Sequence, residues 1–176
     1  MIFRTAKLFQ KKENNQDDIY AIPYGKNEEY YTYIRNMLSD GFEEITITSE
    51  IMLETIKALC ITKRYSIYKI EFDTEDEELD KEIGMLVKNA TTNSKHLTKL
   101  MDRLKFLSEE YSVNIKRIYI KGKYNGFNTP NFFIQSNGII GVNYECYDRI
   151  LDEITDEMKK CLSKKQIINQ QQNHQP

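Results

Sequence analysis

The chain contains no tryptophan, only two histidines and only three cysteines among its 176 residues, and these shortages limit its chemistry. Cys60, Cys146 and Cys161 are widely spaced with no CxxC pair, which favours buried reduced thiols over a nucleophile or a metal ligand. His174 lies in a polar C-terminal stretch, so catalysis by histidine would depend on His96 alone. A single histidine on a polar helix face is more typical of a solvated residue than of a catalytic one.

Long apolar runs and familiar catalytic motifs are also missing. No stretch approaches the roughly 20 apolar residues of a membrane helix, and residues 1–10 lack the apolar block of a secretory signal, so we expect a cytoplasmic protein. The sequence has no GxxxxGK[ST], GxGxxG, HExxH or GxSxG motif and no zinc-type pattern. We therefore predict no cofactor and favour a non-enzymatic protein over an enzyme.

What is present is enough apolar material for one core. Hydrophobic residues make up 40% of the chain, including 8 Phe and 12 Tyr, so global disorder is not expected. The length favours a single α+β domain over residues 1–166, followed by a disordered polar tail over residues 167–176. Richness in Lys, Asn, Ile and Tyr favours an AT-rich coding genome, such as a low-GC bacterium or its mobile elements.

The periodicity of apolar residues predicts a mainly antiparallel sheet with helices on one face. Strands are expected at residues 2–9, 19–23, 44–48, 64–72 and 113–121, with a polar connection at residues 11–18 and a β-hairpin at residues 132–142. A phase change in residues 64–72 indicates a bulge or burial on both faces. Helices are expected to begin after the capping residues Asn27, Ser49 and Asn143. The turn of the hairpin is expected at Asn137 and Gly138.

The longest periodic run, residues 77–111, has nearly heptad spacing of its apolar residues. Residues 91–94 interrupt it, and Asn93 or Ser94 is suited to cap a second helix. A helical hairpin is slightly favoured over one long helix. The spacing also permits a homodimer through residues 77–111, although a contribution to the protein's own core is the simpler interpretation.

The net charge of −2 conceals segregated charges. Residues 71–82 hold eight acids and one lysine, and we expect this segment either to be solvated at a helix start or to bind a protein partner through Asp76, Glu77 and Glu78. A metal-dependent enzyme using carboxylates such as Glu71 and Asp73 is a further alternative, because clustered oxygens suit Mg²⁺.

Bases alternate with aromatic residues further along the chain. Cations neutralise phosphates and aromatic rings stack on unpaired bases, so this mixture is typical of nucleic-acid sites, although a solvated strand face is the simpler interpretation. The candidate residues are Lys116, Arg117, Tyr119, Lys121, Lys123 and Tyr124.

The sequence therefore predicts a small interaction or regulatory protein that binds a protein partner, such as an accessory protein or inhibitor of bacterial mobile-element origin. The first alternative is a nucleic-acid-binding regulator, and the second is a metal-dependent enzyme.

Overall fold

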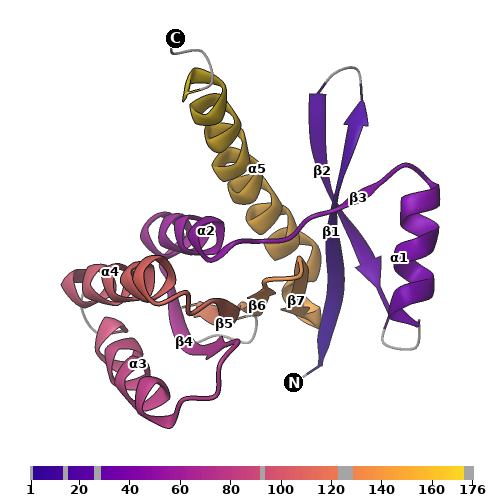
Figure 1. The fold of residues 1–176 in the computed structure, drawn as a ribbon. Helices are drawn as coiled ribbons and strands as arrows, with labels where there is room; N and C mark the ends of the chain where they lie inside the picture. The colour runs from indigo at the N-terminus through magenta and orange to yellow at the C-terminus, as the bar shows by residue number, and fades with distance from the viewer. Residues whose placement is uncertain (1, 14–15, 26–28, 92–93, 123–128, 173–176) are drawn as a thin grey trace.

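The computed structural model describes residues 2–13, 16–25, 29–91, 94–122 and 129–172, and the structural statements below concern these residues. Its strands form one antiparallel sheet in the order β2-β1-β7-β6-β5-β4, and the short strand β3 pairs with β1 beyond the end of β7 (Figure 1). The strands are β1 Phe3–Glu13, β2 Gln16–Tyr24, β3 Glu43–Glu44, β4 Tyr65–Phe72, β5 Ile115–Gly122, β6 Asn131–Gln135 and β7 Ile139–Asn143.

Helices lie on both faces of this sheet, and more of them lie on one face than on the other. They are α1 Tyr30–Ser39, α2 Ser49–Thr62, α3 Glu77–Ala90, α4 Ser94–Glu110 and α5 Tyr147–Gln172, the last preceded by a 3₁₀ turn at Tyr144–Cys146. Helices α2, α4 and α5 cover one face, where the main buried cluster lies (Figure 1). On the other face α1 packs over the β1–β2 hairpin in a second cluster around Phe9, Tyr33 and Ile34. The predicted α+β fold with an antiparallel sheet is confirmed, with α1 as the exception to helices on one face.

The long periodic run folds as a helical hairpin. Helix α3 ends at Ala90 and α4 begins at Ser94, so one continuous helix is excluded. The two helices pack against each other, and Arg103 on α4 donates two hydrogen bonds to the Glu82 carboxylate on α3, at 2.8 and 2.9 Å. Most apolar side chains of both helices belong to or pack against the main buried cluster, whereas Met85 and Phe106 are exposed. A homodimer through residues 77–111 stays an untested prediction.

Two of the expected elements near the N-terminus are wrong in their bounds. Residues 11–18 were assigned to a connection because they are polar, but β1 and β2 continue into them through the backbone ladder of a long hairpin. Residues 44–48 form a strand only at Glu44; Ile45 and Ile47 are buried because this extended segment crosses the core side of the sheet, where Ile47 N–H bonds to Ser136 O.

The expected helix caps also need correction. Thr48, not Ser49, caps α2, and the Ser49 hydroxyl instead accepts a hydrogen bond from Ile115 N–H on β5. Asn143 does not cap the last helix, because its side-chain oxygen accepts from Asn131 N–H on the neighbouring strand. Asn27 lies outside the described residues. Helix α5 continues to Gln172 and so includes residues 167–172 of the expected tail, and residues 173–176 lie outside the described part.

The expected irregularities of the sheet are present. The pairing of β4 with β5 shifts register between Ile67 and Lys69, which is the bulge that the phase change indicated. The β6–β7 turn has Gly138 at φ 79°, the left-handed region that favours glycine.

Lys7 is a buried cation that joins three segments near this turn. Its side chain is 1% exposed, and its ammonium lies 3.3 Å from the Glu44 carboxylate. It donates to the carbonyl of Ile45, at 3.2 Å, and to that of Asn137. Burial lowers the pKa of Lys7, and the neighbouring Glu44 offsets this only in part. The ammonium thereby connects β1, the segment after β3 and the β6–β7 turn.

In the described part of the chain, no helix is long and apolar enough to cross a membrane.

Candidate functional site: the open face of the sheet

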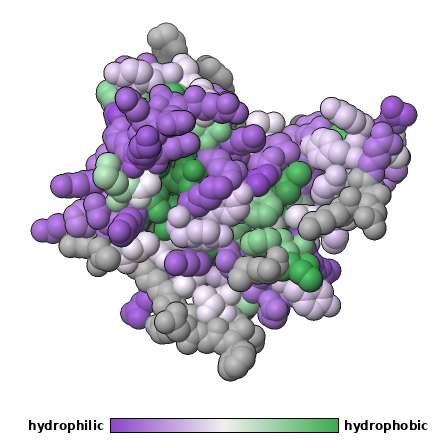
Figure 2. Space-filling view, turned by 90° about the horizontal axis from the view of Figure 1, so that it is seen from below, coloured by the Kyte–Doolittle hydropathy of each residue, from purple (hydrophilic) through white to green (hydrophobic). Residues whose placement is uncertain are grey.

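The central strands leave one face of the sheet without a covering helix in the part of the chain that the structure describes. On β5, Ile118 and Ile120 are fully buried against the helices, whereas Arg117, Tyr119 and Lys121 point the other way, as their alternation predicts. We call the surface made by these outward side chains and their neighbours on β4, β6 and β1 the open face. Figure 2 views the molecule from below and shows green apolar side chains at the bottom of a hollow, with purple polar side chains around it.

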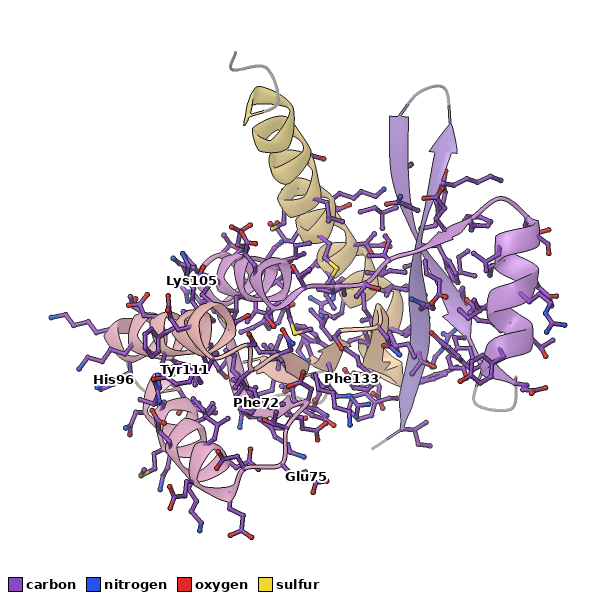
Figure 3. All side chains as sticks on the ribbon, in the orientation of Figure 1. Phe72, Glu75, His96, Lys105, Tyr111 and Phe133 are labelled. Carbon is purple, nitrogen blue, oxygen red and sulfur yellow. The ribbon has the colours of Figure 1, made fainter. Side chains whose placement is uncertain are left out.

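A row of aromatic rings crosses the open face. Tyr119 on β5 lies directly opposite Phe133 on β6, with ring centroids 5.7 Å apart. Tyr68 on β4 extends the row at 5.8 Å from Tyr119, and Phe3 on β1 extends it at 5.5 Å from Phe133. We call Phe3, Phe133, Tyr119 and Tyr68 the aromatic row; Figure 3 labels Phe133 at its place on the sheet.

Strand β7 makes room for the row because Gly141 has no side chain. Gly141 pairs with Phe133 across the β6–β7 ladder, and a Cβ atom at position 141 would overlap the Phe133 ring. The glycine therefore lets this ring lie down against the sheet and lets the row continue from β6 to β1.

Three cations lie over these rings. The Arg117 guanidinium is 4.8 Å from the Phe133 centroid, the Lys69 ammonium 5.2 Å from that of Tyr119, and the Lys121 ammonium 5.8 Å from that of Tyr68. Contacts of this length are within the range of cation–π attraction. The open face thus combines aromatic surface with positive charge, although the whole chain is slightly acidic.

Glu71 on β4 organises these cations. Its carboxylate lies 2.6 Å from Lys69, accepts from the Tyr119 hydroxyl at 3.1 Å, and lies 3.8 Å from Arg117. Partial burial alone would raise the pKa of Glu71, but the hydrogen bonds from Lys69 and Tyr119 and the two positive charges lower it. Arg117 also donates to Gln135, at 2.6 Å. Glu71 is therefore ionised at neutral pH and holds the rings and cations in place.

The structure brings only part of the predicted basic and aromatic set together. Arg117, Tyr119 and Lys121 share the open face, but Lys116 lines a groove beside β4 instead. Lys123 and Tyr124 lie outside the described residues.

The predicted acidic site lies elsewhere, at the start of α3. Asp76 is the N-cap, and its carboxylate accepts from the N–H groups of Glu78 and Leu79. Glu77 lies 3.6 Å from Lys81, and Glu78 is exposed. These contacts place negative charge at the start of α3, where the helix dipole favours it, and binding of a protein partner through the three residues stays a prediction.

The carboxylates of the metal alternative are engaged with protein groups. Glu71 holds the cations described above, and Asp73 accepts a hydrogen bond from Asn114 N–H at 3.1 Å. Within the described ranges, no three His, Cys, Asp or Glu side chains are placed to hold a metal ion.

Three of the four rings of the row, Phe3, Tyr68 and Phe133, are not predicted site residues. Tyr68 lies in the expected strand of residues 64–72 and Phe133 in the expected hairpin of residues 132–142, but neither ring is predicted to belong to a site. The available signal was that Phe133 stands between the inward residues Phe132 and Ile134, which puts its ring on the outward face. Its position beside Tyr119 depends on strand register, which the sequence does not state.

Comparison with protein-family models, with curated proteins and with solved structures finds no match.

Proposed function

We propose that this protein binds single-stranded nucleic acid on the open face, with bases stacked on the aromatic row. The observation that carries the proposal is the continuous row of Phe3, Phe133, Tyr119 and Tyr68 on a sheet face without a covering helix among the described residues. Rings on a sheet surface stack with unpaired bases of any sequence, and the cations beside them attract the phosphates.

The same chemistry favours single strands over duplexes. In a duplex the bases stack on one another and present only their edges, so rings lying on a sheet gain no stacking partner. Lys69, Arg117 and Lys121 outnumber Glu71 on this surface, which supports attraction of a polyanion. Affinity should fall as salt rises, because bound phosphates release their counterions.

The stacking role is tested by removing two rings together. Tyr119→Leu with Phe133→Leu keeps apolar side chains but removes the aromatic surface, and stacking contributes about 1–3 kcal/mol per base. We expect roughly 30-fold or greater loss of affinity for a labelled single-stranded oligonucleotide, measured by fluorescence anisotropy at low salt.

The chain offers a matched control pair. Phe106 and Tyr111 also lie ring against ring, at 5.4 Å, and are exposed at the end of α4, on a different element from the row. Phe106→Leu with Tyr111→Leu should leave affinity within about twofold, since surface substitutions away from a site have small effects. The proposal fails if the wild-type protein binds neither DNA nor RNA single strands at low salt, or if both double variants bind like the wild type.

A further inference from the structure

Strand β4 ends the sheet with an unpaired edge. It pairs with β5 on one side, and no strand in the described part of the chain pairs with its other side. An edge strand presents a row of backbone N–H and C=O groups that can pair with another extended chain. A charged side chain protects an edge from pairing, but that of Lys69 is held by Glu71 and by the ring of Tyr119.

Hollows accompany this edge along its whole length. A groove of about 670 Å³ is lined by residues 68–72, and a second hollow of about 310 Å³ by residues 65–67. The first groove is lined both by Tyr68, Lys69 and Glu71, which belong to the open face, and by Ile70 and Phe72, which are buried. A groove lined by side chains from both faces of β4 passes around the edge of the strand. We call the two hollows together the edge groove.

Helix α3 forms the opposite wall of the edge groove and runs antiparallel to β4. Its first turn lies by Phe72, and Ala90 at its end lines the hollow beside Ile67. Figure 3 places Phe72 and Glu75 where β4 leads into α3. The wall is open at Gly84, where a Cβ atom would meet nothing within 4 Å.

The lining of the groove is apolar on its floor and acidic at one end. Ile70, Phe72, Ile83 and Val87 are nearly buried and supply an apolar floor, whereas the end near the start of α3 is lined by acids. These acids are Glu75, Asp76, Glu77 and Asp80, and with Glu71 they outnumber the two lysines of the lining, Lys69 and Lys116. An incoming strand with basic side chains complements this end, and its apolar side chains complement the floor.

We propose that the edge groove binds an extended segment of a partner protein, which adds to β4 as a further strand and carries alternating apolar and basic residues. Main-chain hydrogen bonds to the edge supply affinity, and the floor and the acids select the side chains. This site goes beyond the proposed nucleic-acid function, because it uses the backbone edge of β4, although Tyr68, Lys69 and Glu71 border both surfaces.

The test uses a fluorescein-labelled synthetic peptide of alternating valine and lysine, titrated by anisotropy at near-physiological salt. Two derivatives carry N-methyl groups, one on the valines and one on the lysines. In a strand addition only every second N–H of the peptide bonds to the edge, so one derivative should lose at least tenfold in affinity and the other should bind like the parent. Absence of binding at millimolar peptide, or equal binding of both derivatives, overturns the proposal.

Position 84 supplies a matched pair of variants. Gly84→Ala and Gly84→Phe both replace glycine in the middle of a helix by a residue with better helix propensity, but only the phenylalanine fills the groove. We expect the alanine variant to bind the peptide within twofold of the wild type and the phenylalanine variant to lose at least tenfold. Equal binding by the two variants would contradict a site in the groove.

A peptide with glutamate in place of lysine tests the acids. It should bind at least tenfold more weakly than the lysine peptide, and equal binding would overturn the assignment of a basic partner. Phe133→Leu alone removes a ring of the aromatic row that does not line the groove, and this variant should keep its peptide affinity. Failure of the nucleic-acid proposal and failure of this one are therefore distinguishable.

Discussion

Replacing Lys7 by methionine is expected to lower the free energy of unfolding by about 2–3 kcal/mol, because the new side chain fills the space but donates no hydrogen bond. The carbonyls of Ile45 and Asn137 then lose a donor inside the protein, and Glu44 loses its ion-pair partner. Urea unfolding followed by circular dichroism measures the change. Lys57→Met, at an exposed position on α2, is the matched control and should stay within about 0.5 kcal/mol of the wild type.

The difference in stability between the wild type and the Lys7→Met variant is expected to depend on pH. Because burial lowers the pKa of Lys7 in the folded state, the unfolded chain binds more protons between that lowered pKa and the ordinary value of 10.5. The contribution of Lys7 to the free energy of unfolding therefore rises with pH through that window. The difference in free energy of unfolding between the wild type and the Lys7→Met variant should grow as the pH approaches 10.5. A Lys7→Met protein that unfolds like the wild type at neutral pH would show that the buried ammonium has no structural role.

Gly138→Ala is expected to destabilise the protein by about 3 kcal/mol, from two costs at one position. The residue has φ 79°, which costs a non-glycine residue roughly 1 kcal/mol. In addition, the new Cβ would lie 2.5 Å from the backbone oxygen of Ile45 and 3.0 Å from the Lys7 ammonium. A backbone oxygen that lies in the core cannot move away without disturbing the contacts around Lys7.

A second glycine separates these two costs. Gly41 has φ 82°, but its nearest atom to a new Cβ is the side-chain carbon Cε of Lys11 at 3.8 Å. Gly41→Ala should therefore lose only about 1 kcal/mol, the conformational cost alone. If Gly138→Ala is no more destabilising than Gly41→Ala in the same urea titration, the close approach of the turn to Ile45 is not important for stability.

Local sequence patterns predict those elements whose side chains alternate cleanly. The alternation of Ile118 and Ile120 with Arg117 and Tyr119 identifies both faces of β5, and the phase change in β4 identifies its bulge. The Asn137–Gly138 turn is recognised because a left-handed position favours glycine. These features depend on neighbours in sequence, which is why they are readable without a structure.

Features that depend on partners far along the chain are not readable in this way. The polar end of β1 forms a strand because β2 pairs with it, and Ser49 faces β5 rather than capping its own helix. Lys7 is the clearest case, because a lysine in a strand is ordinarily exposed. Its acceptors come from Glu44, Ile45 and Asn137, and no local pattern brings these groups together.

In the candidate site, too, some features follow from local sequence patterns and others depend on distant parts of the chain. The outward direction of the β5 residues and of Phe133 on β6 follows from alternation. The placement of Phe133 beside Tyr119, and of Phe3 beyond it, follows from the register of β5 with β6 and from the order in which β7 and β1 join the sheet. The edge groove depends on α3 lying beside β4, which the sequence pattern of neither element states.

Photo-crosslinking tests the central claim most directly. A single-stranded oligonucleotide carrying 5-iodouracil is bound to the wild-type protein at low salt and irradiated, and the attached residues are identified by mass spectrometry of the peptides. The proposal predicts attachment at rings of the aromatic row, with Tyr119 and Phe133 foremost. Attachment confined to residues off the open face, such as Phe106 and Tyr111, or no attachment at saturating protein, would contradict it.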